Sequence, residues 1–132
     1  MYKYFMSACL LMLISFSCVD DSPEANDIMG SWNWLSSTGA IAGITLTPKD
    51  TGENIVFEFT TDSVFRQYRN DTLVSDTNFS IITSTSIYNH EQTKMIEISG
   101  SFRRSFSFST SGELILSDEV YDGYISRYKR IK

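Results

Sequence analysis

Residues 53–73, which read ENIVFEFTTDSVFRQYRNDTL, are the stretch that decides the fold. Every second residue from Ile55 to Phe59 is large and apolar, and such a period of two is typical of a half-buried β-strand. Thr61-Asp62-Ser63 interrupts this pattern, and Asn70-Asp71 ends its next repeat. Asn and Asp tolerate the backbone angles of tight turns. The stretch therefore predicts consecutive antiparallel strands joined by hairpins.

The same pattern continues toward the C-terminus, and no segment after residue 28 keeps a helical apolar repeat for three turns. We expect about eight strands, near residues 30–36, 53–60, 63–69, 72–82, 84–90, 93–99, 102–109 and 112–131, the last dividing in two. An open meander of this length leaves two unpaired edges, which closure removes. We therefore predict an all-β fold, a small antiparallel up-and-down barrel, with a β-sandwich as the alternative.

The N-terminus predicts an exported, lipid-anchored protein. Residues 1–17 combine the positive charge of Lys3 with an apolar run that is shorter than the roughly 20 residues of a membrane-spanning helix. The end of this run, Ile14-Ser15-Phe16-Ser17-Cys18, resembles the lipobox of bacterial lipoproteins, whose cysteine receives the lipid. We predict lipidation of Cys18. Residues 18–28 then form an acidic, flexible tether to a domain at residues 29–132.

A second resemblance begins at Gly30-Ser31-Trp32, which is similar to the Gly-x-Trp motif of lipocalins and related calycin barrels. Together with the Gly- and Thr-rich passages that follow, up to about residue 82, it resembles the lipocalin-like lipoproteins of Bacteroidetes. The resemblance implies that Trp32 plugs the closed end of the barrel. It also implies an arginine of the last strand over Trp32, with Arg127 the first candidate and Arg130 the second. With the lipid anchor on Cys18, we expect the protein in the cell envelope, at the outer membrane, on either its periplasmic or its surface face.

Small eight-stranded barrels are either filled by their own side chains or hold one small ligand. The candidate ligand-binding residues are the inward-facing aromatic residues and one arginine: Phe57, Phe59, Tyr68, Phe79, Phe102, Arg104, Phe106 and Tyr124. Segment 37–52 either folds over the barrel mouth or is an ordinary surface crossover that is partly β.

Arg104 falls by alternation on the same face as Phe106, and an inward arginine needs a partner because a buried, unpaired charge is costly. Three explanations remain open. Arg104 awaits a carboxylate ligand, pairs with an internal acid such as Glu97, or is turned outward by a bulge at Arg103-Arg104.

The net charge and the absence of certain motifs exclude several classes of function. A net charge of −5 argues against nucleic acid as a partner. No hydrolase elbow, phosphate-binding loop or His-Glu-x-x-His motif occurs, so we expect no enzyme. His90 is the sole histidine and sits in a polar turn, so we expect no metal and no cofactor.

The resulting hypothesis is a membrane-anchored, monomeric binding module for a small apolar or amphipathic molecule. The alternative is a protein-interaction or structural module of the envelope with a filled barrel, or, as a further possibility, a protease inhibitor.

Overall fold

Nine strands and one short helix follow one another in residues 28–132, the part of the chain that the computed structural model describes. Their bounds are β1 (Gly30–Gly39), β2 (Ile44–Leu46), α1 (Pro48–Thr51), β3 (Ile55–Phe59), β4 (Val64–Arg69), β5 (Thr72–Thr85), β6 (Gln92–Ile98), β7 (Arg104–Phe108), β8 (Leu114–Asp118) and β9 (Tyr124–Arg130). The expected signal peptide at residues 1–17, Cys18 and nearly all of the tether lie outside the described residues.

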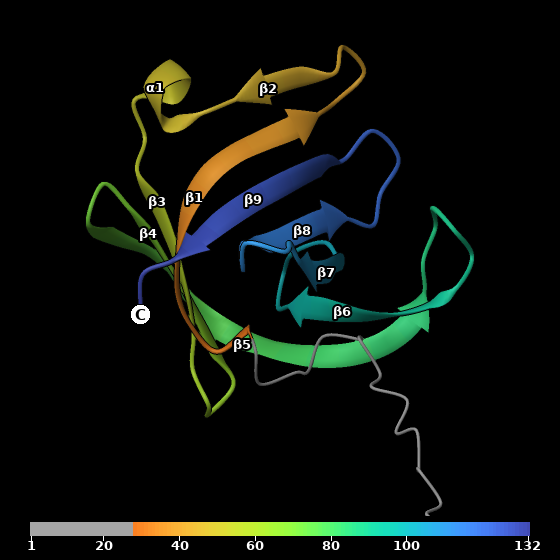
Figure 1. Ribbon diagram of the computed structural model, residues 1–132. Helices are drawn as coiled ribbons and strands as arrows, with labels where there is room; N and C mark the ends of the chain where they lie inside the picture. The colour runs from red at the N-terminus through yellow and green to blue at the C-terminus, as the bar shows by residue number, and fades with distance from the viewer. Residues whose placement is uncertain (1–27) are drawn as a thin grey trace, which may run out of the picture.

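All pairings are antiparallel, and the strand order is β2-β1-β3-β4-β5-β6-β7-β8-β9. Because β9 pairs back onto β1, eight of the strands close into a barrel, and β2 is an addition at the far end of β1 (Figure 1). The predicted all-β, up-and-down barrel is confirmed.

Two details differ from the expectation. The strand predicted at residues 84–90 is wrong, because β5 continues to Thr85 and residues 86–91 form the turn into β6. That turn is fixed by hydrogen bonds from the Ser86 amide to the Glu91 carbonyl oxygen and from the His90 amide to the Ser86 carbonyl oxygen. Strand β2 was not among the eight predicted strands, although a crossover that is partly β was one of the two alternatives for segment 37–52. The last predicted segment divides into β8 and β9, as expected.

The turn between β4 and β5 forms where the sequence places it. Asn70 and Asp71 have φ angles of 48° and 65°, the left-handed region that a two-residue hairpin of this kind requires. The Asn70 side-chain oxygen also accepts a hydrogen bond from the Asn54 amide at 2.8 Å, which ties this turn to the chain that enters β3.

Aromatic side chains fill the middle of the barrel. Phe57 on β3 stacks on Tyr128 of β9 with ring centroids 4.8 Å apart, and meets Phe65 of β4 edge-on at 5.0 Å. Phe59 continues the cluster to Phe79 of β5 at 5.1 Å. Such aromatic pairs contribute about 0.5–1.5 kcal/mol each beyond the burial of their surface.

Trp32 closes one end of the barrel and is fully buried. Its indole N–H donates to the Ile28 carbonyl oxygen at 2.8 Å, and the Arg130 guanidinium lies 4.1 Å from the centre of the indole ring. Gly30 makes this approach possible, because a Cβ at its φ of +122° would run into the Lys132 carbonyl oxygen and the Arg130 side chain.

The arginine over Trp32 is therefore Arg130, and the first choice, Arg127, was wrong. Side chains of a strand alternate between its faces, and Tyr128 of β9 points into the core. Arg130 shares the inward phase of Tyr128, whereas Arg127 has the opposite phase. Arg127 pairs on the outer face with Glu113, at 2.9 Å.

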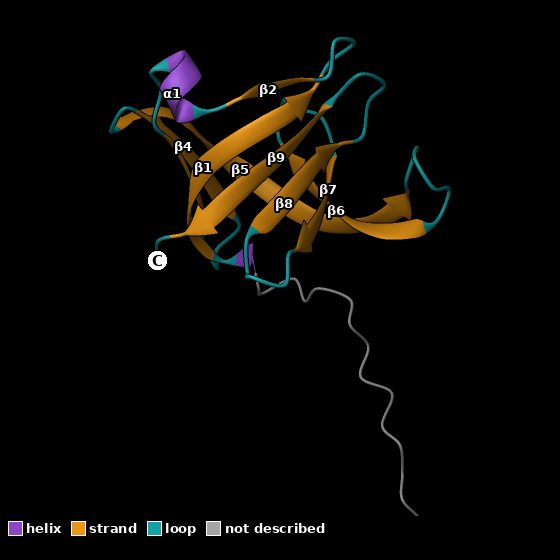
Figure 2. Cartoon of the chain, turned by 45° about the horizontal axis from the view of Figure 1, so that its top comes forward, coloured by secondary structure: helices purple, strands orange, loops and turns teal. Residues whose placement is uncertain are grey.

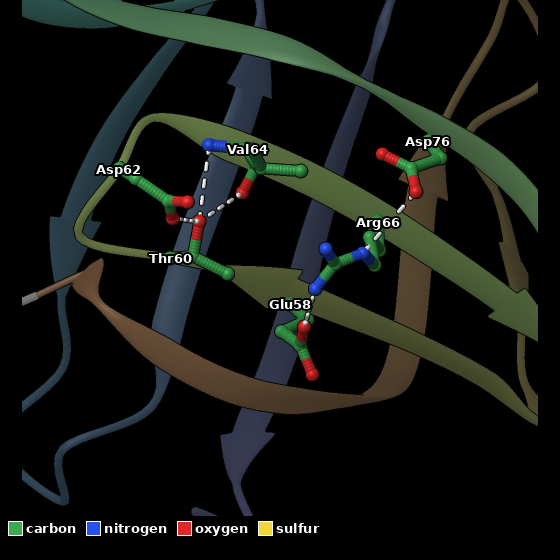
Figure 3. A network of polar contacts seen from close by, with 6 residues as sticks. All are labelled: Glu58, Thr60, Asp62, Val64, Arg66 and Asp76. Carbon is green, nitrogen blue, oxygen red and sulfur yellow. Dashed lines mark hydrogen bonds and ion pairs between the residues drawn. The ribbon is translucent and has the colours of Figure 1, made fainter.

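The outer face of β3, β4 and β5 carries a separate ionic network around Arg66 (Figure 3). The Arg66 guanidinium donates to Glu58 at 2.7 Å and to Asp76 at 3.3 Å, and these bonds raise its pKa, the one to Glu58 most. In the adjoining turn, the Thr60 hydroxyl donates to Asp62 at 2.6 Å, which lowers the pKa of that carboxyl. The network links three strands on the side of the sheet away from the core.

Candidate ligand pocket at the barrel mouth

A pocket of about 340 Å³ opens at the end of the barrel opposite Trp32. Its lining residues come from β1, β2, α1, β3 and the connection between α1 and β3 on one side, and from β7, β8 and β9 on the other: Trp34, Ser37, Leu46, Thr51, Glu53, Ile55, Arg104, Asp118, Tyr124, Ser126 and Tyr128. In both ribbon views, the loops β1–β2 and β8–β9 lie side by side at this end (Figures 1 and 2).

Segment 37–52 forms part of this mouth. Strand β2 pairs with the end of β1, placing Leu46 opposite Ser37 and Ile44 opposite Gly39. Helix α1 follows directly, and its start is capped by the Asp50 carboxylate, which accepts from the Thr47 amide at 2.9 Å. The segment is thus an ordered crossover that is partly β, and it contributes Ser37, Leu46 and Thr51 to the pocket lining.

Arg104 and Asp118 form an ion pair in the opposite wall. The two residues are direct cross-strand partners on β7 and β8, and the Arg104 Nε donates to Asp118 Oδ1 at 2.8 Å. The second carboxylate oxygen, Oδ2, accepts from the Tyr124 amide at 3.1 Å. Their side chains are 23% and 17% exposed, so the pair is largely withdrawn from water.

This pair decides between the three explanations for Arg104. Arg104 lines the inner pocket and has an internal acid as its partner, but the acid is Asp118 and not Glu97. Glu97 pairs instead with Arg103 on the surface, at 2.7 Å.

Hydroxyl groups occupy the wall beneath the ion pair. The Trp34 indole N–H donates to Ser37 Oγ at 2.9 Å, and the Ser37 and Ser126 hydroxyls are hydrogen-bonded at 2.7 Å. The Tyr128 phenol lies nearby, and burial raises its pKa, against the opposing effects of Arg104 and the Ser126 hydroxyl. Because these groups are uncharged, this wall can form hydrogen bonds with a polar group of a ligand without placing a further charge in the pocket.

The structure brings only two of the eight candidate ligand-binding residues into the pocket, Arg104 and Tyr124. Four others, Phe57, Phe59, Phe79 and Phe106, are buried in the packed core and do not line it.

Tyr68 and Phe102 lie elsewhere. Tyr68 pairs with Val56 and lines a different hollow, of about 360 Å³, on the outer wall. The inward placement of Phe102 was wrong: its side chain is 61% exposed, because β7 begins at Arg104 and alternation does not extend back to it.

Sequence reasoning missed most of the pocket lining. Ser126 could have been predicted from the sequence, because Tyr124, Ser126 and Tyr128 alternate along β9 and so share one face. Asp118 could also have been predicted, because a hairpin turn centred on Ser111 pairs it with Arg104. Leu46 was not, since it depends on a three-residue strand that has no periodicity of its own.

The loop that follows Asp118 is held by the turn between β5 and β6. The Glu119 carboxylate accepts from the Ser86 hydroxyl at 3.1 Å and from the Ile87 amide at 2.9 Å. The Tyr88 hydroxyl donates to the Asp118 carbonyl oxygen at 2.7 Å, and burial raises the pKa of Tyr88. These contacts fix the backbone that carries one half of the ion pair.

Comparisons of the chain with protein-family models, with curated proteins and with solved structures give no match. In residues 28–132, no helix has the length and apolar character needed to cross a membrane. The same residues contain no group of three or more His, Cys, Asp or Glu side chains arranged to hold a metal ion.

Proposed function

We propose that the protein is a binding module that holds a small amphipathic molecule at the barrel mouth and performs no catalysis. The observation that carries the proposal is the contrast inside one barrel between a filled core and an open pocket of about 340 Å³ at one end. That volume lies at the lower end of the range of about 300–1,000 Å³ that is typical of small-molecule sites.

The lining has the composition of such a site. Trp34, Leu46 and Ile55 supply apolar surface, and Arg104 and Ser126 are among the polar groups that can orient a ligand. Ligand pockets combine apolar walls with a small number of placed polar groups in this way.

We further propose that the protein is a lipoprotein of the cell envelope, anchored through Cys18. Ile28, the first described residue, is fully buried beside Trp32 at the closed end. A lipidated chain would therefore join the barrel at the end opposite the pocket, which leaves the mouth accessible. The lipobox-like sequence that ends at Cys18, and the apolar run before it, support the anchor.

The test is a variant that fills the pocket. Leu46→Trp places an indole in the lining, whereas Thr45→Trp places one on the exposed, opposite face of β2. We expect native mass spectrometry with added decanamide to detect a one-to-one complex with the unmodified protein and with Thr45→Trp, and none with Leu46→Trp. Equal binding by both variants would show that decanamide binds outside this pocket.

A second candidate function is docking of a protein partner. Phe102 and Tyr121 are 61% and 86% exposed, and their loops are adjacent because the Glu119 amide donates to the Arg103 carbonyl oxygen at 2.9 Å. Neighbouring exposed aromatic side chains are a feature of interaction sites. If docking is the function, Phe102→Ser combined with Tyr121→Ser abolishes crosslinking to an envelope protein and leaves decanamide binding unchanged.

A further inference from the structure

We infer that the mouth pocket selects an uncharged amphiphile with a hydrogen-bonding head group, such as an amide or alcohol, and discriminates against a carboxylate. This inference rests on the proposed function and names its ligand class. It follows from the ion pairs that the charged residues of the pocket already form within the protein.

The positive charge of Arg104 is neutralised within the protein. Asp118 is its partner at 2.8 Å and is itself held by the Tyr124 amide at 3.1 Å. A ligand carboxylate would have to displace Asp118 from Arg104, leaving a largely buried carboxylate without its counter-ion, and a buried charge without its partner is strongly unfavourable.

Glu53 adds a second carboxylate to the lining. Its partner, Arg69, lies 3.6 Å away and is not a lining residue. The lining therefore contains one arginine and two carboxylates, so it carries a formal net negative charge. This charge repels an anionic head group. A cationic head group is attracted by it, but loses part of its hydration on entering the pocket.

Groups that can form hydrogen bonds with an uncharged head group are present in the lining. Arg104 bonds to Asp118 through Nε. Among the described residues, no buried side-chain nitrogen or oxygen lacks a hydrogen-bond partner, so the Nη groups of Arg104 reach either a partner or solvent. Ser37 and Ser126 add hydroxyls that both donate and accept. An amide head group complements such a mixture of donors and acceptors.

The apolar part of the ligand has a path out of the pocket. Leu46 and Ile44 are two residues apart on β2 and so share one face of the strand. Leu46 lines the pocket, and Ile44 continues this face beyond it with 55% of its surface exposed. A single alkyl chain can therefore run from the pocket along β2.

The experiment measures the affinity of the protein for three probes of matched chain by isothermal titration calorimetry at pH 7: decanamide, decanoate and decylammonium. We expect decanamide to bind about tenfold or more tightly than decanoate, the scale set by one disrupted charge-assisted hydrogen bond. We also expect decanamide to bind more tightly than decylammonium, whose charge loses hydration in the pocket. Tighter binding of decanoate or of decylammonium would overturn the inference and leave the proposed function standing. Binding of none of the three would overturn the proposed function as well.

Asp118→Asn sharpens the test, because it releases the charge of Arg104 while keeping the shape of the side chain. We expect this variant to bind decanoate about tenfold more tightly than the unmodified protein does. Glu97→Gln is the matched control, since it removes a carboxylate from an ion pair of similar length on the surface, with Arg103. Glu97→Gln should change neither the decanoate affinity nor the decanamide affinity. An Asp118→Asn variant that prefers decanamide over decanoate as strongly as the unmodified protein does would contradict the inference.

Glu53→Gln keeps the inference testable if Asp118→Asn does not fold. It removes the second negative charge of the lining without touching Arg104, and Glu53 is partly exposed. We expect a gain of about two- to fivefold in decanoate affinity, with decanamide binding unchanged. A loss of decanoate affinity in this variant would contradict the role assigned to the charge.

Discussion

The two ends of the barrel use the same strands in opposite ways. At the closed end, Trp32 is fully buried under Arg130 and the interior is packed with aromatic rings. At the mouth, the interior is lined by hydroxyls and by the ion pair of Arg104 and Asp118, around a pocket of about 340 Å³. The difference teaches that alternation along the strands creates an interior, while the side chains at inward positions decide whether it is packed or open.

Strand β9 shows this within a few residues. Its inward positions pass from Tyr124 and Ser126 at the mouth to Tyr128 in the core and Arg130 over Trp32. Arg104 on β7 and Arg130 on β9 both occupy inward positions, yet Arg104 is neutralised by a carboxylate and Arg130 lies on an aromatic face. An arginine over an indole is a cation–π contact, which needs no buried counter-ion.

The largest expected effect is the loss of stability when the closed end is emptied. Trp32→Ala removes a fully buried indole and should lower the free energy of unfolding by about 3–5 kcal/mol. Leu46→Ala, at the open mouth, should lower it by about 1 kcal/mol, because a side chain that is only partly buried loses less contact. Urea unfolding followed by circular dichroism measures both, and equal losses would break the distinction between the two ends.

A smaller effect separates the ion pair at the mouth from the network on the outer wall. Asp118→Ala leaves Arg104 largely buried without its partner and should cost about 2–3 kcal/mol. Asp76→Ala removes an exposed partner of Arg66, which retains Glu58, and should cost about 0.5 kcal/mol or less. The same urea measurement tests both variants. Similar losses in the free energy of unfolding would mean that the mouth is as well hydrated as the surface.

Tyr128 gives an effect that is absent at neutral pH and appears only at alkaline pH. Burial raises its pKa above the ordinary value of 10.0. Below that pH, the phenol is neutral in both the folded and the unfolded chain. Above it, the unfolded chain ionises first, so the free energy of unfolding falls as the pH rises, by about 1.4 kcal/mol per pH unit for one such group. Tyr128→Phe should make this decline shallower, and an identical decline would show that the phenol is not withdrawn from water.

The fold could be predicted because its signals are local. The alternation from Ile55 to Phe59 and the turn at Asn70-Asp71 each require only neighbouring residues, and both appear in the structure as expected. The phase of β9 is a local signal too, and it places Arg130, and not Arg127, on the inward face with Tyr128.

The pocket could be predicted only in part. The inward position of Arg104 follows from alternation, and the turn around Ser111 was sufficient to place Asp118 opposite it. The contribution of Leu46 depends on β2, which exists because its three residues pair with β1 in the folded barrel. Tertiary pairing of that kind leaves no pattern in the sequence.

The central claim is that the mouth, and not the closed end, binds the ligand, and the two tryptophans of the chain test it most directly. Trp34 lines the pocket with its indole N–H bonded to Ser37, while the indole N–H of Trp32 is bonded to Ile28 at the opposite end. The measurement is a titration of the ¹⁵N-labelled protein with decanamide, followed through the two indole N–H resonances. The account predicts that the Trp34 resonance shifts in a saturable manner while that of Trp32 stays in place. A shift of Trp32 alone, or no shift of either resonance at saturating decanamide, would contradict it.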